Sequence, residues 1–420
     1  MRLITEKVNI GSGSLVIGGG SPIVVQTMCN THTDDVEGTL AQCRRMVAAG
    51  AEMIRITVPG LQDVPHIREI RERLRAEGIM VPIVADIHFS AQTAIEVARF
   101  VDKVRINPGN FHKDHQMARA KFLQLLEVCK AHGTAIRIGI NHGSLGEYIT
   151  NLYGNTPQAM AEAAMEWVRM CVQADFRKVV ISLKSSNTAS MVQGYRALVQ
   201  MMKAEGVVFP LHVGVTEAGG GDSGRIKSCV GIATLLEEGI GDTVRVSLTE
   251  DPVNELPVAR YLAARYSSAP MPQLPERELK MLDAACTWGP KLLRHEVDSI
   301  EEEMDPYLRD EIMQAARRRF YKPEYIACPG CGRTMYDLQK AYREVMEKTA
   351  CFKDIVIAIM GCIVNGPGEM ADADWGYVGE GGGKVSIYKK NVPVLRHIPE
   401  DEAPDRLVAL IREDLKAQGK

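Results

Sequence analysis

The sequence predicts an α/β fold in which a (β/α)8 TIM barrel is followed by a smaller α+β domain. Eight strand-like segments alternate with helical stretches between residues 24 and 250. A proline-rich break follows residue 266, and three cysteines suited to bind a metal lie in the C-terminal part. At 420 residues the chain exceeds the size at which a single core stops growing, so two domains are expected.

Eight short segments rich in β-branched residues are the predicted strands of the barrel. They cover residues 24–28, 53–58, 81–88, 103–109, 135–141, 178–184, 211–217 and 243–249. Helical stretches follow them, for example residues 91–100 after the third strand and 157–173 after the fifth. Successive strands start about 31 residues apart, which is the span of one βα unit. Eight such units favour a closed barrel over an open doubly wound sheet.

The barrel domain is predicted to span residues 1–266. The segment after it, Ser-Ser-Ala-Pro-Met-Pro-Gln-Leu-Pro, cannot sustain a helix or a strand. A charged, partly helical connector over residues 267–324 follows. Its acidic run 301–303 and its basic run 317–319 are expected on solvated helix faces.

The last domain, residues 325–420, is predicted to be a small α+β module. It is expected to contain a helix, a strand, a hairpin and a final helix over residues 336–348, 355–360, 385–395 and 404–416. The stretch from Gly379 to Lys384 invites comparison with a phosphate loop, but the glycine spacing is wrong and Val385 stands where Ser or Thr is required. We interpret it as a flexible loop.

Composition and charge exclude several classes of function. Hydrophobic residues make up 45% and charged residues 25% of the chain, and the formal net charge is -3, so no overall basic field exists to hold nucleic acid. No apolar run reaches the roughly 18 residues of a membrane-spanning helix. The N-terminus is charged where a signal peptide needs an apolar core. We therefore expect a cytoplasmic protein with neither a nucleic-acid nor a membrane partner.

Charged side chains alternate with apolar ones along several predicted strands. Arg55 alternates with Ile54 and Ile56, and the pattern recurs at Asp86 and His88, Arg105 and Asn107, Arg137 and Asn141, and Arg245 and Ser247. Strand side chains alternate between two faces, so the polar residues share the face that points into the barrel. Barrel interiors normally hold Val, Ile and Leu, so a ring of arginines there predicts a bound polyanion such as a phosphate ester. The alternative is that the arginines lie outside or form structural ion pairs with Asp86 and Glu217.

Further polar residues are predicted at the rim of the barrel, where enzymes of this fold keep their catalytic groups. Lys184 ends the sixth strand, and His212 and Glu217 bracket the seventh. The loop Ala-Gly-Gly-Gly-Asp-Ser-Gly follows the seventh strand, a frequent place for a phosphate cradle. His88 by itself is more often typical of a core or capping histidine, and its neighbours favour a functional role.

Three of the ten cysteines are the candidate metal ligands. Cys328 and Cys331 lie in Ala-Cys-Pro-Gly-Cys-Gly, and Cys362 lies in Met-Gly-Cys-Ile-Val-Asn-Gly-Pro-Gly-Glu. Structural zinc normally takes four ligands in paired knuckles, whereas three thiolates can hold an iron-sulfur cubane and leave one iron open. An iron-sulfur cluster therefore fits better, and it indicates redox chemistry. The other cysteines are expected to be small buried hydrophobic residues, at positions Cys29, Cys43, Cys129, Cys171, Cys229, Cys286 and Cys351.

Together these features resemble the family of 4-hydroxy-3-methylbut-2-enyl diphosphate synthases, in its bacterial two-domain form, from the methylerythritol phosphate route to isoprenoids. The resemblance covers nearly the whole chain. It is carried by eight ordered motifs: Ile-Arg-Ile-Thr-Val-Pro, Ala-Asp-Ile-His-Phe, Val-Arg-Ile-Asn-Pro-Gly-Asn, Ile-Arg-Ile-Gly-Ile-Asn-His-Gly-Ser, Ser-Leu-Lys-Ser-Ser-Asn, His-Val-Gly-Val-Thr-Glu-Ala-Gly, Ala-Cys-Pro-Gly-Cys-Gly and Gly-Cys-Ile-Val-Asn-Gly-Pro-Gly-Glu.

The resemblance implies a reaction and a role for each candidate residue. Such enzymes open the ring of 2-C-methyl-D-erythritol 2,4-cyclodiphosphate and remove a hydroxyl with two electrons. The resemblance implies a 4Fe-4S cluster whose ligands are Cys328, Cys331, Cys362 and the carboxylate of Glu369. The diphosphate would be held by Arg55, Arg105, Arg137, Lys184 and Arg245, assisted by Asn141 and His88. Glu217 is the candidate proton donor to the departing hydroxyl.

The resemblance also implies partners. Flavodoxin or ferredoxin would donate the electrons, and family members work as homodimers in which the barrel of one chain faces the cluster domain of the other. The connector of this chain is longer and more charged than a compact bacterial member needs, so the resemblance does not fix the path of the chain between the two domains.

Two other interpretations compete with this one. A pterin- or corrinoid-linked methyltransferase shares a barrel with polar residues inside, but it leaves the cysteines unused. A zinc-binding interaction module over residues 325–420 needs a fourth ligand such as Cys351 or His397, and Cys351 lies outside any knuckle.

Overall fold

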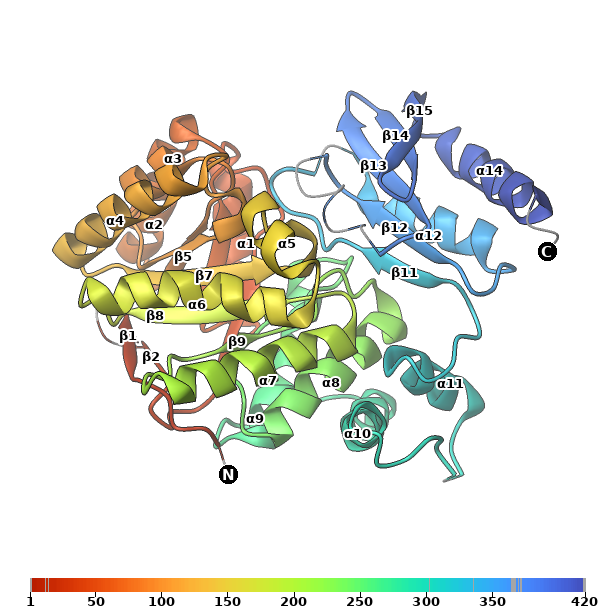
Figure 1. Ribbon diagram of the computed structural model, residues 1–420, viewed down its shortest axis with the longest axis horizontal. Coiled ribbons are helices and arrows are strands. Elements are labelled where there is room, and N and C mark those ends of the chain that lie inside the picture. The colour runs from red at the N-terminus through yellow and green to blue at the C-terminus, as the bar shows by residue number, and fades with distance from the viewer. Residues whose placement is uncertain are drawn as a thin grey trace.

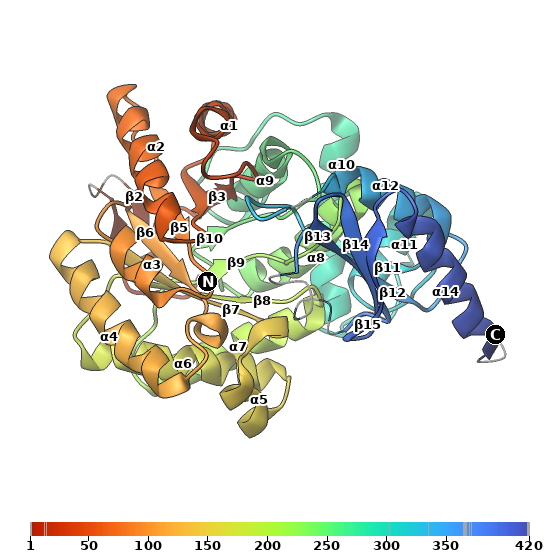
Figure 2. The ribbon, with the colours of Figure 1, turned by 90° about the horizontal axis from the view of Figure 1, so that it is seen from above.

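The computed structural model describes residues 2–11, 13, 15–301, 303–334, 336–363, 368, 370 and 372–417. Two views at right angles show a barrel wrapped by helices with a smaller sheet domain beside it (Figures 1 and 2). In both views the last helix, α14, lies on the side of the small domain away from the barrel. None of the helices within the described residues is long and apolar enough to span a membrane.

The barrel strands and the helices between them follow one another along the chain. A short hairpin comes first, β1 (Val8–Ile10) and β2 (Leu15–Ile17). The barrel strands are β3 (Val24–Met28), β4 (Met53–Thr57), β5 (Ile83–Asp86), β6 (Lys103–Ile106), β7 (Ala135–Asn141), β8 (Val179–Lys184), β9 (His212–Val213) and β10 (Thr243–Val244). The helices are α1 (Val36–Ala48), α2 (Val64–Ala76), α3 (Ala91–Val97), α4 (His115–His132), α5 (Glu147–Tyr153), α6 (Pro157–Gln173), α7 (Thr188–Ala204), α8 (Gly221–Glu237) and α9 (Glu255–Tyr266). Short 3-10 turns cover Leu61–Asp63, Pro108–Asn110, His142–Ser144 and Pro252–Asn254.

The predicted TIM barrel is confirmed. The eight strands pair in the order β8-β7-β6-β5-β4-β3-β10-β9, and all of these pairs are parallel. A parallel bridge between Ile181 and Leu211 joins β8 to the start of β9 and closes the ring. The last two strands are shorter than predicted, two residues each.

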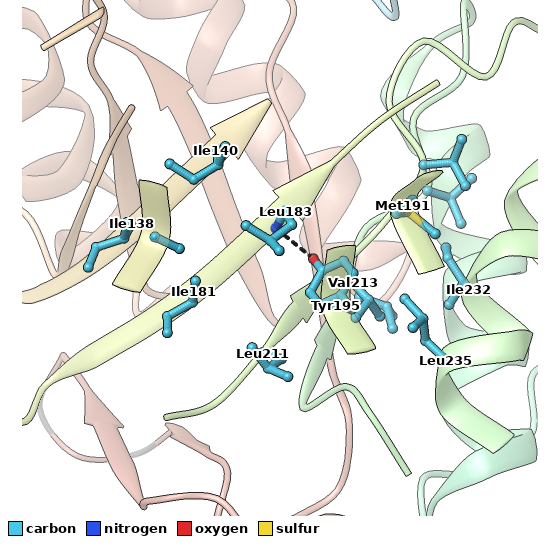
Figure 3. Close-up of a cluster of buried hydrophobic side chains, with 14 of the residues drawn as sticks. Ile138, Ile140, Ile181, Leu183, Met191, Tyr195, Leu211, Val213, Ile232 and Leu235 are labelled. Atoms are coloured by element: carbon cyan, nitrogen blue, oxygen red, sulfur yellow. Dashed lines mark hydrogen bonds between the residues drawn. The ribbon is translucent and has the colours of Figure 1, made fainter. Parts of the chain in front are cut away.

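The apolar residues of the strands face outward and pack against the helices. Figure 3 shows Ile181 and Leu183 of β8 beside Leu211, with Met191 and Tyr195 of α7 and Ile232 of α8 around them. The buried Tyr195 hydroxyl accepts a hydrogen bond from Leu183 N at 3.0 Å and donates one to His212 O at 2.5 Å, so it ties two strands to the helix layer. Since the apolar positions are used here, the alternating polar positions point into the barrel.

The N-terminal hairpin, which the strand pattern did not predict, closes one end of the barrel. Val8, Ile10 and Ile17 of this hairpin form a buried cluster with residues near the starts of the barrel strands. Those residues are Val24, Met53, Val84, Ala135 and Val180. This apolar layer is the floor of the barrel.

The connector is part of the barrel body rather than a loose tether. Its helices are α10 (Glu276–Leu293) and α11 (Pro306–Ala315), and both pack on α8. A Cβ on Gly289 would lie 2.8 Å from the Cα of Val230, so the glycine allows α10 to touch α8. The two charged runs were expected on helix faces, and this is wrong. Described residues of the acidic run lie in a loop, and the basic run follows the end of α11.

The described part of the C-terminal domain has a mixed five-stranded sheet and two helices of 12 and 15 residues. Its elements are β11 (Glu324–Ala327), α12 (Leu338–Thr349), β12 (Val356–Met360), β13 (Trp375–Gly381), β14 (Lys384–Lys389), β15 (Val392–Pro399) and α14 (Ala403–Ala417). The sheet order is β11-β12-β13-β14-β15, parallel for the first three strands and antiparallel afterwards. Both helices contribute to one apolar cluster, α12 through Leu338 and Val345 and α14 through Leu407 and Ile411.

Two expectations for this domain are corrected. Residues Gly379 to Lys384 are not a flexible loop, because they form the end of β13, a two-residue turn at Gly382 and Gly383, and the start of β14, with a bulge between Gly379 and Gly381. Cys351 is exposed after α12, whereas the six other cysteines expected to be buried are buried.

Candidate active site

The candidate residues gather at the end of the barrel opposite the hairpin. Pairing between strands places Arg55 beside Val84, Asp86 beside Arg105, and Arg105 beside Arg137. The carboxyl ends of parallel strands meet at one end of a barrel, so these side chains converge. One cavity is lined by every described candidate, namely Arg55, His88, Arg105, Arg137, Asn141, Lys184, Glu217, Arg245, Cys328, Cys331 and Cys362.

Asp86 is the centre of one ion-pair network in the cavity. Its carboxylate lies 3.1 Å from Arg105 Nη1 and 3.4 Å from His88 Nε2. Burial raises the pKa of Asp86, but the charges of Arg55 and Arg105 outweigh burial and hold it well below its usual range. Arg105 also donates to Gly139 O at 3.1 Å and to Asn141 Oδ1 at 3.4 Å. Arg105 therefore forms the ion pair with Asp86 that the alternative interpretation expected, while its guanidinium still lines the cavity.

His88 is held as a neutral ring. Its Nε2 lies 2.5 Å from Arg105 Nη1, and its Nδ1 lies 3.0 Å from the side-chain amide of Asn110. Burial, and after it the charge of Arg333, lower the pKa of His88 to about 3. Arg105 Nη1 and the Asn110 amide nitrogen are both N–H donors, which favours the neutral ring over the doubly protonated one.

Arg245 has a carboxylate partner that strand alternation did not reveal. Glu255, the first residue of α9, lies 3.0 Å from Arg245 Nη2 and also accepts a hydrogen bond from Leu248 N. Both side chains are buried. Glu255 follows the eighth barrel strand in the sequence and lies on a helix, so no period-2 pattern connects it to the barrel interior.

Within the part of the chain that the structure describes, Arg55, Arg137 and Lys184 form no ion pair with a carboxylate. Arg55 contacts the thioether of Met28 at 2.7 Å. Burial lowers the pKa of Arg55 to about 9; the charge of Asp86 opposes this shift, and the charges of Arg245 and Arg105 add to it. Within the described residues, Arg137 Nε and Nη1 have no hydrogen-bond partner, although the side chain is 1% exposed. Burial, followed by the charges of Arg245 and Arg55, lowers the pKa of Lys184 well below its usual range. Buried cations without partners are costly, and an anion in this cavity would offset that cost.

Two polar residues lie deeper in the barrel than the rim. His212 was predicted at the rim, and this is wrong, because it lies fully buried at the start of β9 with Nδ1 3.3 Å from Thr243 Oγ1. Burial, and then the charges of Arg137 and Lys184, lower its pKa. Lys103 was missed, although it has the same strand parity as Arg105 and is also fully buried.

The glycine loop after β9 is used for domain contact rather than as a phosphate cradle. Gly220 N donates to the hydroxyl of Tyr342 on α12 at 3.0 Å, and Gly221 N donates to Glu250 at 2.7 Å. A Cβ on Gly219 would lie 2.8 Å from the Tyr342 hydroxyl oxygen. These amide groups already have partners, so the expected phosphate role of the loop is corrected.

Glu217 lies at the junction of the two domains. Its backbone adopts a left-handed φ of 48°, which is uncommon for a residue other than glycine. Its carbonyl accepts a hydrogen bond from Ala327 N at 3.2 Å, directly before Cys328. Thr249 Oγ1 donates to the carbonyl of Cys328 at 3.0 Å. The strand that leads to the cysteines is thus seated on the barrel rim.

The three cysteine thiols line the wall of the cavity that faces the arginines. Cys328 Sγ accepts from Gly361 N at 3.2 Å, and Cys331 Sγ accepts from Arg333 N at 3.4 Å. Burial, and then the neighbouring Cys362 and Cys331, raise the pKa of Cys328. A thiolate at this position needs a bound cation, and metals bind cysteine as the thiolate. The donor set therefore fits an iron-sulfur cluster.

The proposed fourth ligand, Glu369, lies outside the described residues. Among the residues that the structure does describe, no three His, Cys, Asp or Glu side chains are grouped closely enough for a single metal ion. A cubane has a different requirement, because each thiolate binds a separate iron of the cluster.

The C-terminal domain at the mouth of the barrel belongs to the same chain. Gly332 packs on the Thr31 carbonyl, where an added Cβ would lie 2.7 Å away, and Gly368 packs still more closely on the Gly143 carbonyl. The resemblance implied that the cluster domain of a second chain faces the barrel. In this structure the chain's own domain occupies that place.

Family models match both parts of the chain. The GcpE TIM-barrel domain matches residues 5–260, and the GcpE protein C-terminal domain matches residues 324–413. The chain belongs to the GcpE family. The region between the two matches contains the connector helices α10 and α11.

Curated relatives align with nearly the whole of this chain. The 4-hydroxy-3-methylbut-2-en-1-yl diphosphate synthase (ferredoxin) of Synechococcus sp. (strain CC9311) is 41% identical over 431 residues, covering 98% of this chain and 95% of the relative. The 4-hydroxy-3-methylbut-2-en-1-yl diphosphate synthase (flavodoxin) of Phocaeicola vulgatus is 34% identical over 601 residues, covering 98% of this chain and 98% of the relative. That alignment is longer than 420 residues, so the relative has a segment that this chain lacks.

Several solved structures of other enzymes resemble the GcpE chain distantly. Dihydropteroate synthase from Burkholderia cenocepacia, complexed with 7,8-dihydropteroate, is 14% identical with a TM-score of 0.43, covering 63% of this chain and 99% of that one. A likeness of this size carries no argument about substrate. The curated relatives do not favour the alternative of a pterin- or corrinoid-linked methyltransferase.

Proposed function

We propose that the cavity between the barrel and the C-terminal domain is the active site of this GcpE family member. The chain is an oxidoreductase that forms 4-hydroxy-3-methylbut-2-enyl diphosphate, an isoprenoid precursor. One observation supports this placement above the others. Among its described lining residues the cavity has six cationic side chains and two carboxylates, opposite three cysteine thiols. A small polyanion that must be reduced fits such a surface.

The barrel side would bind the diphosphate of the cyclic substrate. Arg137 offers Nε and Nη1, and Arg55 offers a guanidinium that contacts the thioether of Met28. Lys184 comes from the end of β8, next to Asn141 in register. Arg105 and Arg245 are already anchored by carboxylates, so they would hold fixed charge toward the anion while keeping their own positions. His88 and Asn141 would add hydrogen bonds.

The thiols would hold the cofactor. We propose a 4Fe-4S cluster with Cys328, Cys331, Cys362 and Glu369 as ligands, and when bound it supplies electrons one at a time. Two electrons enter the substrate, the ring bond from carbon to the phosphate oxygen breaks, and the hydroxyl leaves as water. Glu217, which lines the same cavity, is the proposed donor of the proton that this water needs.

A cysteine comparison tests the cluster assignment. Protein purified without oxygen is expected to contain about four irons and four sulfides per chain, in keeping with a cubane. The Cys328→Ser variant should lose most of this iron, whereas Cys351→Ser, at an exposed cysteine of the same domain, should keep it. Electron paramagnetic resonance should change on adding the cyclodiphosphate. Zinc without sulfide after attempted reconstitution contradicts the proposal.

The partners and the boundaries are proposed on the same basis. Flavodoxin or ferredoxin would supply electrons, as the names of the relatives indicate for those proteins. We propose a homodimer, a barrel domain over residues 1–266, a connector over 267–324 and a cluster domain over 325–420, in a cytoplasmic enzyme. Sedimentation measures the assembly, and limited proteolysis measures the boundaries.

A mixing experiment determines which chain supplies each half of the site. Lys184→Ala removes a barrel cation, and Cys328→Ser removes a cluster ligand in the other domain. If both halves of a site come from one chain, as the seating of β11 on the rim suggests, the mixed variants stay inactive. Recovery of activity on mixing means that the halves come from two chains.

A further inference from the structure

Arg333 is a charged residue of the cavity that neither strand alternation nor cysteine spacing singled out. It lies two residues after Cys331, yet its guanidinium reaches the barrel. Arg333 Nη2 donates to the backbone carbonyl of Asp86 at 3.3 Å, and Nη1 lies 3.8 Å from Asp86 Oδ2 and 4.0 Å from Cys331 Sγ. The side chain is 8% exposed. One side chain therefore lies between the thiol wall and the cationic wall.

The charge around Arg333 is unfavourable when no anion is present. Asp86 is the nearest carboxylate, but it is already shared with Arg105 and His88 at shorter distances. The other cations that line the cavity are Arg55, Arg137, Lys184 and Arg245. Like charges in a water-poor site repel more strongly than in water. An arriving diphosphate reverses this balance, because it brings negative charge between the barrel cations and Arg333.

The turn that carries Arg333 has a fixed seat on the barrel. Its neighbour Gly332 lies against the Thr31 carbonyl with no room for a Cβ. On the other side of the mouth, Ala327 N donates to the carbonyl of Glu217. Arg333 reaches Asp86 only because these backbone contacts bring the C-terminal domain against the rim. The position of its charge therefore reports whether the two domains are docked.

We propose that Arg333 is a positioning residue that couples binding of the diphosphate to docking of the cluster domain. The inference rests on the proposed function, because it uses the same cavity and the same anionic substrate. The barrel cations bind the anion, the anion attracts Arg333, and the turn around Cys331 is drawn onto the rim. Asp86 holds Arg333 in this place when the anion is absent.

The experiment compares Arg333→Gln with Arg343→Gln in cluster-loaded protein prepared without oxygen. Arg343 is an exposed arginine on α12 of the same domain, so its variant makes the same change in charge away from the cavity. Two quantities are measured: the dissociation constant for the cyclodiphosphate, and hydrogen exchange at the amides of Gly220 and Ala327 with and without inorganic diphosphate. Both amides donate across the domain contact.

Wild type and Arg343→Gln should bind the substrate equally and gain amide protection when diphosphate is added. Arg333→Gln should bind about tenfold or more weakly, the size expected for a lost charge-assisted hydrogen bond, and should gain no protection. Arg333→Lys should recover part of both, and iron content should stay unchanged in all. If wild type binds substrate and Arg333→Gln behaves identically, the coupling role is overturned. If loaded wild type binds no cyclodiphosphate, the proposed function itself fails.

Discussion

The two ends of the barrel use the same strands and the same face of each strand for opposite purposes. At the floor, Met53, Val84 and Ala135 pack with the N-terminal hairpin in an apolar cluster. Two residues further along the same strands, the inward positions are Arg55, Asp86 and Arg137. A step of one alternation period thus changes the barrel from a packed core into a charged cavity.

This difference separates stability from function along a single strand. The floor residues stabilise the barrel by removing apolar surface from water. The mouth residues act in the opposite direction, since burial of cations without full partners costs free energy. The destabilising cations lie where an anion is expected to bind, and the stability of the apolar floor offsets their cost.

The comparison is tested most strongly by removing a mouth cation. Arg137→Met should weaken binding of the cyclodiphosphate by about a thousandfold, because one guanidinium can make two charge-assisted hydrogen bonds. The thermal midpoint should stay the same or rise, because a buried charge is replaced by an apolar side chain. Calorimetric titration and thermal unfolding measure the two effects. A large fall in stability with binding intact would mean that Arg137 belongs to the structural core.

The matching change at the floor should have the reverse outcome. Met53→Ala, two residues from Arg55 on β4, should lower the free energy of unfolding by about 3 kcal/mol, because it leaves a cavity in a fully buried cluster. Substrate affinity of the folded protein should not change. Denaturant unfolding and titration at low temperature check both. If Met53→Ala loses substrate affinity but not stability, the two ends of the barrel do not separate stability from binding.

A substitution at Glu217 separates the contribution of the mouth residues to substrate binding from their contribution to the chemical step. Glu217→Gln keeps the shape and removes the acid, so turnover should fall about a hundredfold while substrate affinity is retained. Single-turnover reduction and titration measure these separately. Should binding fail as well, Glu217 would be a structural residue of the domain junction, where its carbonyl contacts Ala327.

The smallest expected effect is a pH dependence of stability caused by His88. Its folded pKa is lowered to about 3, whereas an unfolded histidine titrates near its ordinary value of about 6.5. Between these values the unfolded chain binds a proton that the folded chain does not, so stability falls as the pH is lowered from about 6.5 toward 3. The loss should be about 2 kcal/mol at about pH 5.

Unfolding of His88→Asn between neutral and acid pH measures this effect. The variant should be less sensitive to pH than wild type, and His132→Asn, at an exposed histidine, is the matched control. If the free energy of unfolding of His88→Asn depends on pH as steeply as that of wild type, the folded protein does not keep the His88 ring neutral.

Local sequence patterns were sufficient for much of the barrel and of its site. Strand alternation predicted that Arg55, Arg105 and Arg137 share the inner face, because a period of two residues is a property of the backbone itself. The spacing of Cys328 and Cys331 predicted a common metal site, because two cysteines three residues apart in one turn can bind the same metal centre. The roles of these residues stay predictions, and the variants above address them.

Other features depended on contacts between distant segments. Glu255 pairs with Arg245 from a helix, and the hairpin containing Ile10 seals the floor; neither contact has a periodic signature. Arg333 reaches Asp86 across two domains.

By itself, the sequence determined the fold class, the parity of the strands and the chemistry of the candidate ligands, since each follows from neighbouring residues. Only the tertiary structure decided that the glycine loop contacts Tyr342, that the connector joins the barrel core and that the chain's own C-terminal domain lies at the mouth. The physical reason is that docking between segments depends on complementary shape and register, and these exist only once both surfaces have folded.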